Sequence, residues 1–333
     1  MAVLTPAPPA SAGGAGASPA GPAAPSAPSR PLGAALPGVV LTLLSVLLVA
    51  VCANLAVVSH LTNARAQDLA HDELRLQLAR GTTPVGPTFV PEAEVVAPGP
   101  GAAPVDPSAP VDEPEPRLVP DGTPLAVLAI PRLGLDGEVV LEGSTSGVLQ
   151  DGVGHDRLTA MPGQPGWVQL LGKRWTYGAP FRDLTDLRYG DAIRVTTGQG
   201  THEYRVTGRR SAGQPAPVLQ PGQGRMVLVT ADGPAFVPEG VTYVDALLSS
   251  IPVAGTGAQV LPSEPEGDPL AGDPGGWVPL LLWSQALLVA ALGLAWAWTR
   301  WGRAQTLFVA VPVLVVVAAG ISGSFSLVLP NLL

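Results

Sequence analysis

The chain has 333 residues, 38 of them Pro and 40 Gly, with a net charge of −8 and a mean hydropathy of +0.33. Apolar residues and Pro or Gly residues are segregated along the sequence, which excludes one ordinary globular domain. No block of Lys or Arg offers the basic surface that nucleic acid requires, so we expect no nucleic-acid partner.

The chain begins with residues 1–35, which are mostly Pro, Ala, Gly and Ser and predict a disordered cytoplasmic tail. Residues 36–58 are apolar for long enough to cross a bilayer, which takes about 20 helical residues. This first span also loosely fits a signal peptide with a processing site near Cys52, but its length favours an uncleaved anchor. Arg30 precedes the span, which places its N-terminal end in the cytoplasm.

Residues 59–80 carry leucines among alternating charges and predict a juxtamembrane amphipathic helix, with a solvated stalk as its role. The leucines are Leu69, Leu74, Leu76 and Leu78. Residues 81–124 are rich in Pro and acidic side chains and predict a stiff, extended linker.

Residues 125–250 have the pattern of one mainly β domain, because short apolar or alternating runs are separated by Gly, Pro and Asp. The predicted strands are 125–130, 138–141, 167–171, 192–197, 202–207, 226–230 and 242–248. Their spacing favours a closed barrel over a parallel α/β sheet.

Residues 251–276 predict a second linker that leads to two further apolar spans, residues 277–299 and 306–329. Arg300 and Arg303 lie in the turn between these spans, which places that turn in the cytoplasm. The sequence therefore predicts a multi-pass protein of the cell membrane, with the β domain outside the cytoplasm.

The domain of residues 125–250 contains an ordered set of local motifs that resembles the actinobacterial sortases. The motifs are IPRLGL at 130–135, EG at 142–143, LQDGVGH at 149–155, PGQPG at 162–166, GKR at 172–174, YGAPF at 177–181, LRYGD at 187–191 and TA at 230–231. The resemblance implies a membrane-anchored, eight-stranded sortase barrel. It also implies an activity on the sorting signals of secreted proteins, whose acyl group is passed to an amine of the cell wall or a pilin.

The resemblance further implies a catalytic Cys, His and Arg, and this chain has other residues at the matching positions. Ala231 stands at the Cys position, Lys173 at the His position, and Val244 is the best match for the Arg. The methyl group of Ala231 cannot attack a carbonyl. The chain's one cysteine, Cys52, lies in the first span, so the exported domain has no thiol.

A substitute nucleophile remains an alternative. Thr230 and Asp232 flank Ala231, but neighbouring strand residues point to opposite faces. A dyad of Lys173 with a serine stays open, although a lone Lys is ordinarily a surface cation. The candidate serines are Ser144, Ser146 and Ser211.

Further candidates for a residual groove are Arg174, Tyr177 and Trp167, with the loop 211–224 as a wall stiffened by Pro215, Pro217 and Pro221. His155 lies in a turn of the family pattern and predicts a structural hydrogen bond. His202 predicts an exposed or packing residue on a strand, and His60 and His71 lie in the helical segment. These histidines form no metal-binding pattern, so we expect neither a metal nor another cofactor.

Two functions of different classes follow, and a plainer third. The first is a pseudo-sortase that binds an extended peptide or sorting signal without cleaving it, as an accessory module in surface-protein or pilus display. The second is an active, cysteine-independent peptidase or transpeptidase built around Lys173. The third is a structural envelope protein with a barrel and no peptide site.

Overall fold

The computed structural model describes residues 45, 48–49, 52–53, 57–86, 88–89, 117–235, 237–255, 272–300, 303–330 and 332. Residues 46–333 form one compact unit, and every contact reported below lies within it. The predicted tail, most of the predicted first span and much of both predicted linkers lie outside the described residues.

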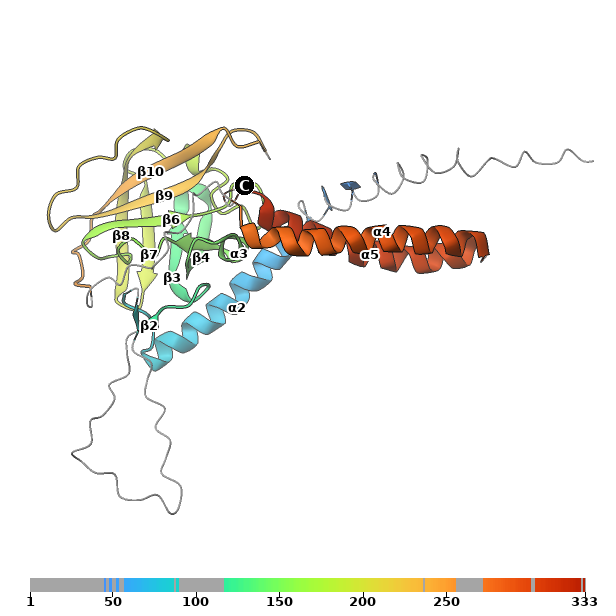
Figure 1. The fold of residues 1–333 in the computed structure, drawn as a ribbon. Helices are drawn as coiled ribbons and strands as arrows, with labels where there is room; N and C mark the ends of the chain where they lie inside the picture. Colours follow the sequence, from blue (N-terminus) through green and yellow to red (C-terminus); the bar gives the residue numbers. More distant parts are fainter. Residues whose placement is uncertain are drawn as a thin grey trace, which may run out of the picture. The chain divides into compact units, whose positions relative to one another are not determined.

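Eight strands close into a barrel (Figure 1), which confirms the predicted mainly β fold. Their order around the barrel is β10-β8-β7-β3-β4-β5-β6-β9, and the pairs β4/β5 and β6/β9 are parallel. The strands are β3 (Pro124–Ile130), β4 (Leu135–Glu142), β5 (Val153–His155), β6 (Gly166–Leu171), β7 (Ala192–Thr197), β8 (Gly200–Ser211), β9 (Gly224–Asp232) and β10 (Gly240–Leu248). A separate small sheet pairs β1 (Thr88–Phe89) with β2 (Arg117–Leu118).

The strands follow from the period-two alternation of apolar side chains. In β7, for example, Ile193 and Val195 are buried while Arg194 and Thr196 are exposed. The inward-facing side chains form the main core, which includes Leu128 on β3. β9 differs because both of its faces are buried, from Gly224 to Ala231, so something covers its outer face as well.

The helices are α2 (Ser59–Arg80), α3 (Ser146–Asp151), α4 (Trp277–Arg300) and α5 (Arg303–Val328). Three short 3-10 turns accompany them, η2 (Pro131–Leu133), η3 (Leu184–Asp186) and η4 (Pro274–Gly276).

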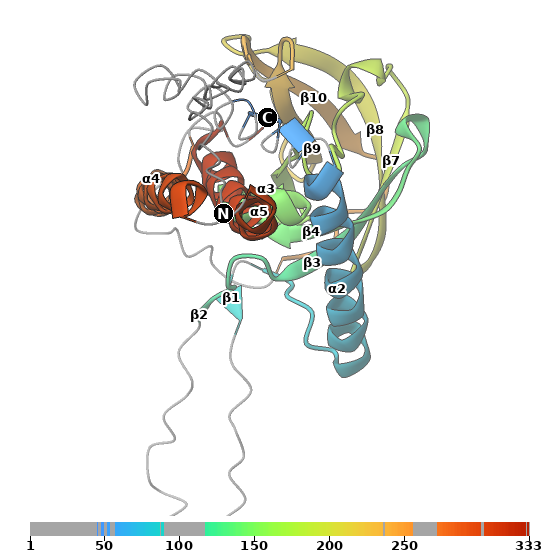
Figure 2. The same ribbon diagram turned by 90° about the vertical axis from the view of Figure 1, so that its right-hand side faces the viewer.

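Helix α2 packs along the barrel beside β3 and β4 (Figure 2), so it is not the solvated stalk expected from the sequence. Polar and apolar side chains both make the contact: Gln67 donates to the carbonyls of Val139 and Asp151 and accepts from the Val139 N–H at 2.7 Å, and Ala70 and Leu74 join an apolar cluster with β4. Leu74 is buried, whereas Leu69, Leu76 and Leu78 are exposed. The leucine pattern therefore identified the helix but not the face that it buries.

Helices α4 and α5 lie side by side as a hairpin (Figure 2). Each contains a segment long and apolar enough to cross a membrane, Pro274–Leu294 and Phe308–Val328. In the described part of the chain these are two candidate spans, not three, because most of residues 36–58 lies outside it.

Candidate functional site

The end of β9 places Ala231 in a second buried apolar cluster, on the outer face of the strand. Successive side chains of β9 alternate: Leu228 belongs to the main core, whereas Val227, Val229 and Ala231 belong to the second cluster. Leu149, Leu171, Val241 and Leu332 complete this cluster, and Tyr243 packs against it. The Ala231 side chain is therefore packed among apolar side chains.

Lys173 follows β6 and is the one lysine of the sequence. It is 1% exposed, which corrects the expectation of a surface cation. Phe181 donates its N–H to the Lys173 carbonyl at 3.2 Å and packs on Gly172, where an added Cβ would lie 2.6 Å from the Phe181 ring. The Phe181 ring can pack this closely because Gly172 has no side chain, and it thereby helps to bury Lys173.

The burial of Lys173 changes its chemistry. Its ammonium lies 5.6 Å from the centroid of the Tyr177 ring, a cation–π contact. Burial lowers the pKa of Lys173 to about 7, because a charged amine loses its hydration in the interior. A substantial fraction of this amine is therefore neutral near pH 7.

Arg174 holds the end of β9. Its Nη1 donates to the Ala231 carbonyl at 2.9 Å and to the Asp232 Oδ1 at 3.1 Å. Its own main-chain N–H donates to the carbonyl of Leu332 at 3.1 Å. The guanidinium of Arg174 thus holds the backbone at Ala231, and its main-chain N–H holds the segment after α5.

The segment around the end of α5 covers this site. The Leu332 side chain is fully buried in the cluster that contains Ala231. The Tyr177 hydroxyl donates to the Ser326 Oγ at 2.7 Å, and Gln150 Nε2 donates to the same atom at 3.4 Å. Leu332, which follows α5, therefore packs on the outer face of β9, a feature that no sequence pattern indicated.

Tyr177 occupies a strained turn. Tyr177 and Ala179 have positive φ values of 51° and 48°, in a region that costs a non-Gly residue energy. The turn is held by the Ser326 contact and by His60, whose Nδ1 accepts from the Gly178 N–H at 3.0 Å. Both α2 and α5 therefore hydrogen-bond to the turn whose Tyr177 ring contacts Lys173.

The register of β10 determines which of its side chains share the face of Ala231. Val244 pairs with Leu228 and packs in the barrel core, so its side chain lies on the face opposite to Ala231. The residue paired with Ala231 is Val241, which shares its apolar cluster. A side chain that reaches the Ala231 face from β10 must therefore come from Val241 or Tyr243.

The alternative nucleophiles differ in burial and hydrogen bonding. Thr230 is fully buried, and its hydroxyl donates to the Gly172 carbonyl at 2.9 Å. Ser211 is exposed at the end of β8, where it pairs with Thr242. Ser146 is buried in α3, and its Oγ has no hydrogen-bond partner among the described residues.

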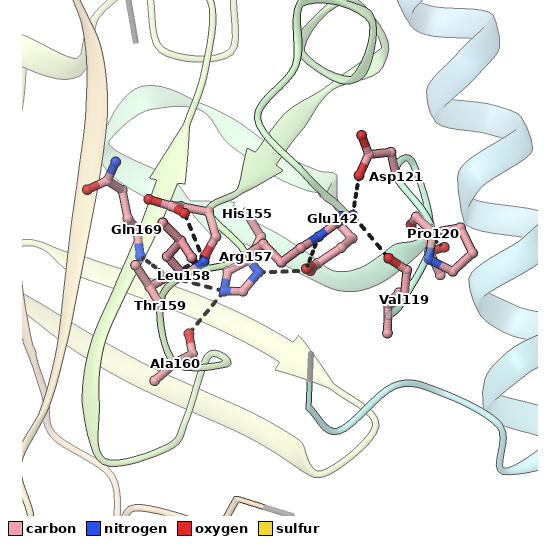
Figure 3. Close-up of polar contacts among 12 residues, drawn as sticks. Val119, Pro120, Asp121, Glu142, His155, Arg157, Leu158, Thr159, Ala160 and Gln169 are labelled. Atoms are coloured by element: carbon pink, nitrogen blue, oxygen red, sulfur yellow. Dashed lines mark hydrogen bonds and ion pairs between the residues drawn. The ribbon is translucent and has the colours of Figure 1, made fainter. Parts of the chain in front are cut away.

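His155 belongs to a buried polar network (Figure 3), as the predicted structural role requires. Its Nδ1 lies 2.9 Å from Glu142 Oε2, and its Nε2 lies 3.0 Å from the Ala160 carbonyl. Arg157 donates to the other Glu142 oxygen at 3.2 Å and pairs with Asp121. Burial alone lowers the pKa of His155, but Glu142 and the Ala160 carbonyl outweigh it and raise that pKa above its ordinary value.

The remaining candidates lie elsewhere. Trp167 pairs with Arg225 near the start of β6, at the other end of that strand from Lys173. His202 is 3% exposed and packs against Gly163, as a packing residue. Within the described ranges, no three His, Cys, Asp or Glu side chains gather where they could hold a metal ion.

A cavity of about 630 Å³ opens at the other end of the same outer surface. It is bounded by β8, β10 and the loop 212–223, including Pro215 and Pro217 of the predicted groove wall. The loop therefore lines a hollow, although that hollow surrounds Arg225 and Asp245 instead of Ala231.

Comparison with known proteins assigns the barrel. The family model of the sortase domain matches residues 128–243. Sortase E from Streptomyces avermitilis is 34% identical, over 40% of this chain and 91% of its own, with a TM-score of 0.34. A Clostridium perfringens sortase D5 transpeptidase is 26% identical, over 40% and 82%, with a TM-score of 0.34. A search of the curated proteins found no match.

The matched domain spans most of the barrel, and sortase E is 34% identical over nine-tenths of its own length. The chain belongs to the sortase family.

Proposed function

We propose that this chain is a membrane-anchored, extracytoplasmic pseudo-sortase, which binds surface-protein segments without cleaving them. In this proposal Ala231 and Lys173 replace the family Cys and His, and Val241, not Val244, stands where the Arg would face them. The two apolar helices of the hairpin would anchor the chain, and the barrel would act as an accessory module in surface-protein or pilus display.

The observation that carries the proposal is the apolar burial of Ala231. Acyl transfer requires a nucleophile, a proton carrier and a donor to the oxyanion. Ala231 supplies a methyl group, its β10 neighbour Val241 is aliphatic, and Leu332 fills the space beside them. Ala231 removes the nucleophile and Val241 offers no donor to the oxyanion, while Leu332 fills the space that a substrate would need. The barrel that would present the chemistry is intact.

The second candidate is a cysteine-independent peptidase or transpeptidase. One observation favours it: the lowered pKa of Lys173, to about 7, gives a neutral amine suited to general-base work. The same lysine is 1% exposed, however, and the adjacent Thr230 hydroxyl already donates to a backbone carbonyl. The enclosed site favours the first proposal.

The test is mass spectrometry of the full-length chain in detergent, incubated with sorting-signal peptides and an amine acceptor. A pseudo-sortase returns every peptide intact. Cleaved or amine-linked peptide that survives thiol alkylation and disappears in Lys173→Met would overturn the proposal and favour the second candidate.

A further inference from the structure

The cavity beside β8 and β10 is basic. Its lining includes Arg210 and Arg225 and a single carboxylate, Asp245, so positive charge exceeds negative by one. Arg209 also lines the cavity, but its Nη1 donates to the Thr185 carbonyl at 2.9 Å, and its β10 partner is the core residue Val244. The whole chain has a net charge of −8. A cationic hollow on an acidic protein is a local feature that average composition does not explain.

The arginines are fixed in place but keep unused donors. Arg210 Nε donates to Asp245 Oδ2 at 2.9 Å, and its guanidinium lies 4.3 Å from the centroid of the Tyr243 ring. The two terminal nitrogens of Arg210 make no hydrogen bond to any residue that the structure describes. A planar guanidinium held in this way is prepared to bind a carboxylate through two parallel hydrogen bonds.

The deepest part of the cavity is incompletely bonded. Arg225 Nε and Asp245 Oδ1 lie 3.9 Å apart, both are buried, and neither has a hydrogen-bond partner within the described ranges. Arg225 Nη1 donates to the Pro217 carbonyl, which ties the loop to the strand. A buried guanidinium nitrogen that lacks a hydrogen bond is costly in a folded protein, and an anionic group bound beside Arg225 would supply the missing acceptor.

We propose that this cavity binds a carboxylate side chain of an extended acidic peptide. The volume of about 630 Å³ exceeds the size of a lone inorganic anion, and Pro215, Pro217 and Leu247 provide apolar walls for the neighbouring chain. This inference rests on the proposed binding role and supplies its partner: an acidic segment of a surface protein. The site lies apart from the Ala231 face and needs no chemistry there.

The test measures binding by the full-length chain in detergent. The probe is a fluorescein-labelled peptide of alternating Glu and Val, and its matched control has Gln in place of every Glu. We expect the Glu peptide to bind, the Gln peptide to bind at least about tenfold more weakly, and the affinity to fall with added salt.

Two variants locate the binding. Arg210→Gln removes the guanidinium with two unused terminal nitrogens and weakens binding of the Glu peptide by about tenfold. Its matched control, Arg194→Gln, removes an exposed arginine of β7 and leaves the affinity unchanged. Asp245→Asn removes the competing carboxylate and tightens binding, provided that its thermal midpoint shows a folded protein.

Equal binding of the Glu and Gln peptides, or equal effects of Arg210→Gln and Arg194→Gln, would overturn the inference. If inorganic phosphate displaces the peptide at a concentration on the order of that of the peptide, about 1 to 2 equivalents, the cavity is a site for small anions instead. Mass spectrometry of the same samples separates the two proposals, since cleaved peptide contradicts the pseudo-sortase and unbound peptide contradicts the acidic-peptide site.

Discussion

The main-chain N–H of Arg174 donates a 3.1 Å hydrogen bond to the carbonyl of Leu332. This bond joins the segment after β6 to the segment after α5, and the guanidinium of the same Arg174 bonds to the Ala231 carbonyl. The Leu332 side chain is thereby held in the cluster around Ala231. The site is filled by the protein itself, so a ligand for that face must first displace Leu332.

This arrangement predicts that Leu332 protects residue 231 from solvent. In a Cys52→Ser background, Ala231→Cys should react slowly with a maleimide, and adding Leu332→Ser should accelerate labelling at least about tenfold. Burial of a leucine side chain contributes roughly 1.5–3 kcal/mol, and 1.4 kcal/mol corresponds to a factor of ten. The readout is the labelled fraction against time by intact-mass spectrometry.

Val218→Cys is the control for that experiment, because Val218 is 94% exposed. Its labelling rate should be the same with Leu332 and with Leu332→Ser. Rapid labelling of Ala231→Cys while Leu332 is in place would show that the segment after α5 does not occupy the site.

We expect the amine of Lys173 to titrate well below the usual range of a lysine. Selective ¹⁵N labelling of lysine gives a single side-chain signal, since the chain has one lysine. We expect that signal to titrate with a pKa of about 7 in the folded protein and near 10.5 after unfolding. A folded-state value near 10.5 would contradict the burial of this amine.

The same shift predicts how stability depends on pH. Between about pH 7 and 10.5 the unfolded chain binds the Lys173 proton and the folded chain does not, so stability rises with pH, by at most about 1.4 kcal/mol per pH unit. Lys173→Met should be more stable than the parent below pH 7 and should lose this rise. Urea denaturation at several pH values measures the difference.

The His155 network predicts the opposite dependence. Because the pKa of His155 is raised in the folded state, its contribution to stability is complete below about pH 6.5 and is lost as pH rises through the raised value. The stability difference between the parent and His155→Gln should therefore be largest in acid and shrink on the alkaline side. A difference that grows with pH would show that Glu142 does not stabilise the charged imidazole.

We expect the hydrogen bonds of Gln67 to stabilise the attachment of α2 to the barrel. Gln67→Ala removes the hydrogen bonds to Val139 and Asp151 and leaves buried backbone groups unpaired, at a cost of roughly 1–3 kcal/mol. Hydrogen exchange of α2 should accelerate accordingly. Leu69→Ala, on the exposed side of the same helix, should leave the exchange unchanged.

The sequence predicted the barrel well because alternation and turn residues mark long strands: β7 was predicted at its observed bounds. It missed β5, since three residues such as Val153–His155 are too few to show a period. The motif match of Val244 did not indicate which face of β10 its side chain occupies, because a motif match fixes neither the register nor the parity of a strand.

The candidate site was predicted only in part, for physical reasons. Ala231, near the end of β9, and Arg174, in the motif that follows β6, do lie together. The burial of Lys173 depends on Phe181 and on the turn of Tyr177, and the filling of the site depends on Leu332. These are contacts between segments far apart in the chain, which local composition does not encode.

Rebuilding the site tests most directly whether the barrel keeps a sortase frame without its chemistry. The full-length chain carrying Ala231→Cys, Lys173→His, Val241→Arg and Leu332→Ser should cleave a sorting-signal peptide in a mass-spectrometric assay. The same set with Val244→Arg in place of Val241→Arg should be much less active, and the unmodified chain should give no product. Product from the unmodified chain would contradict the account.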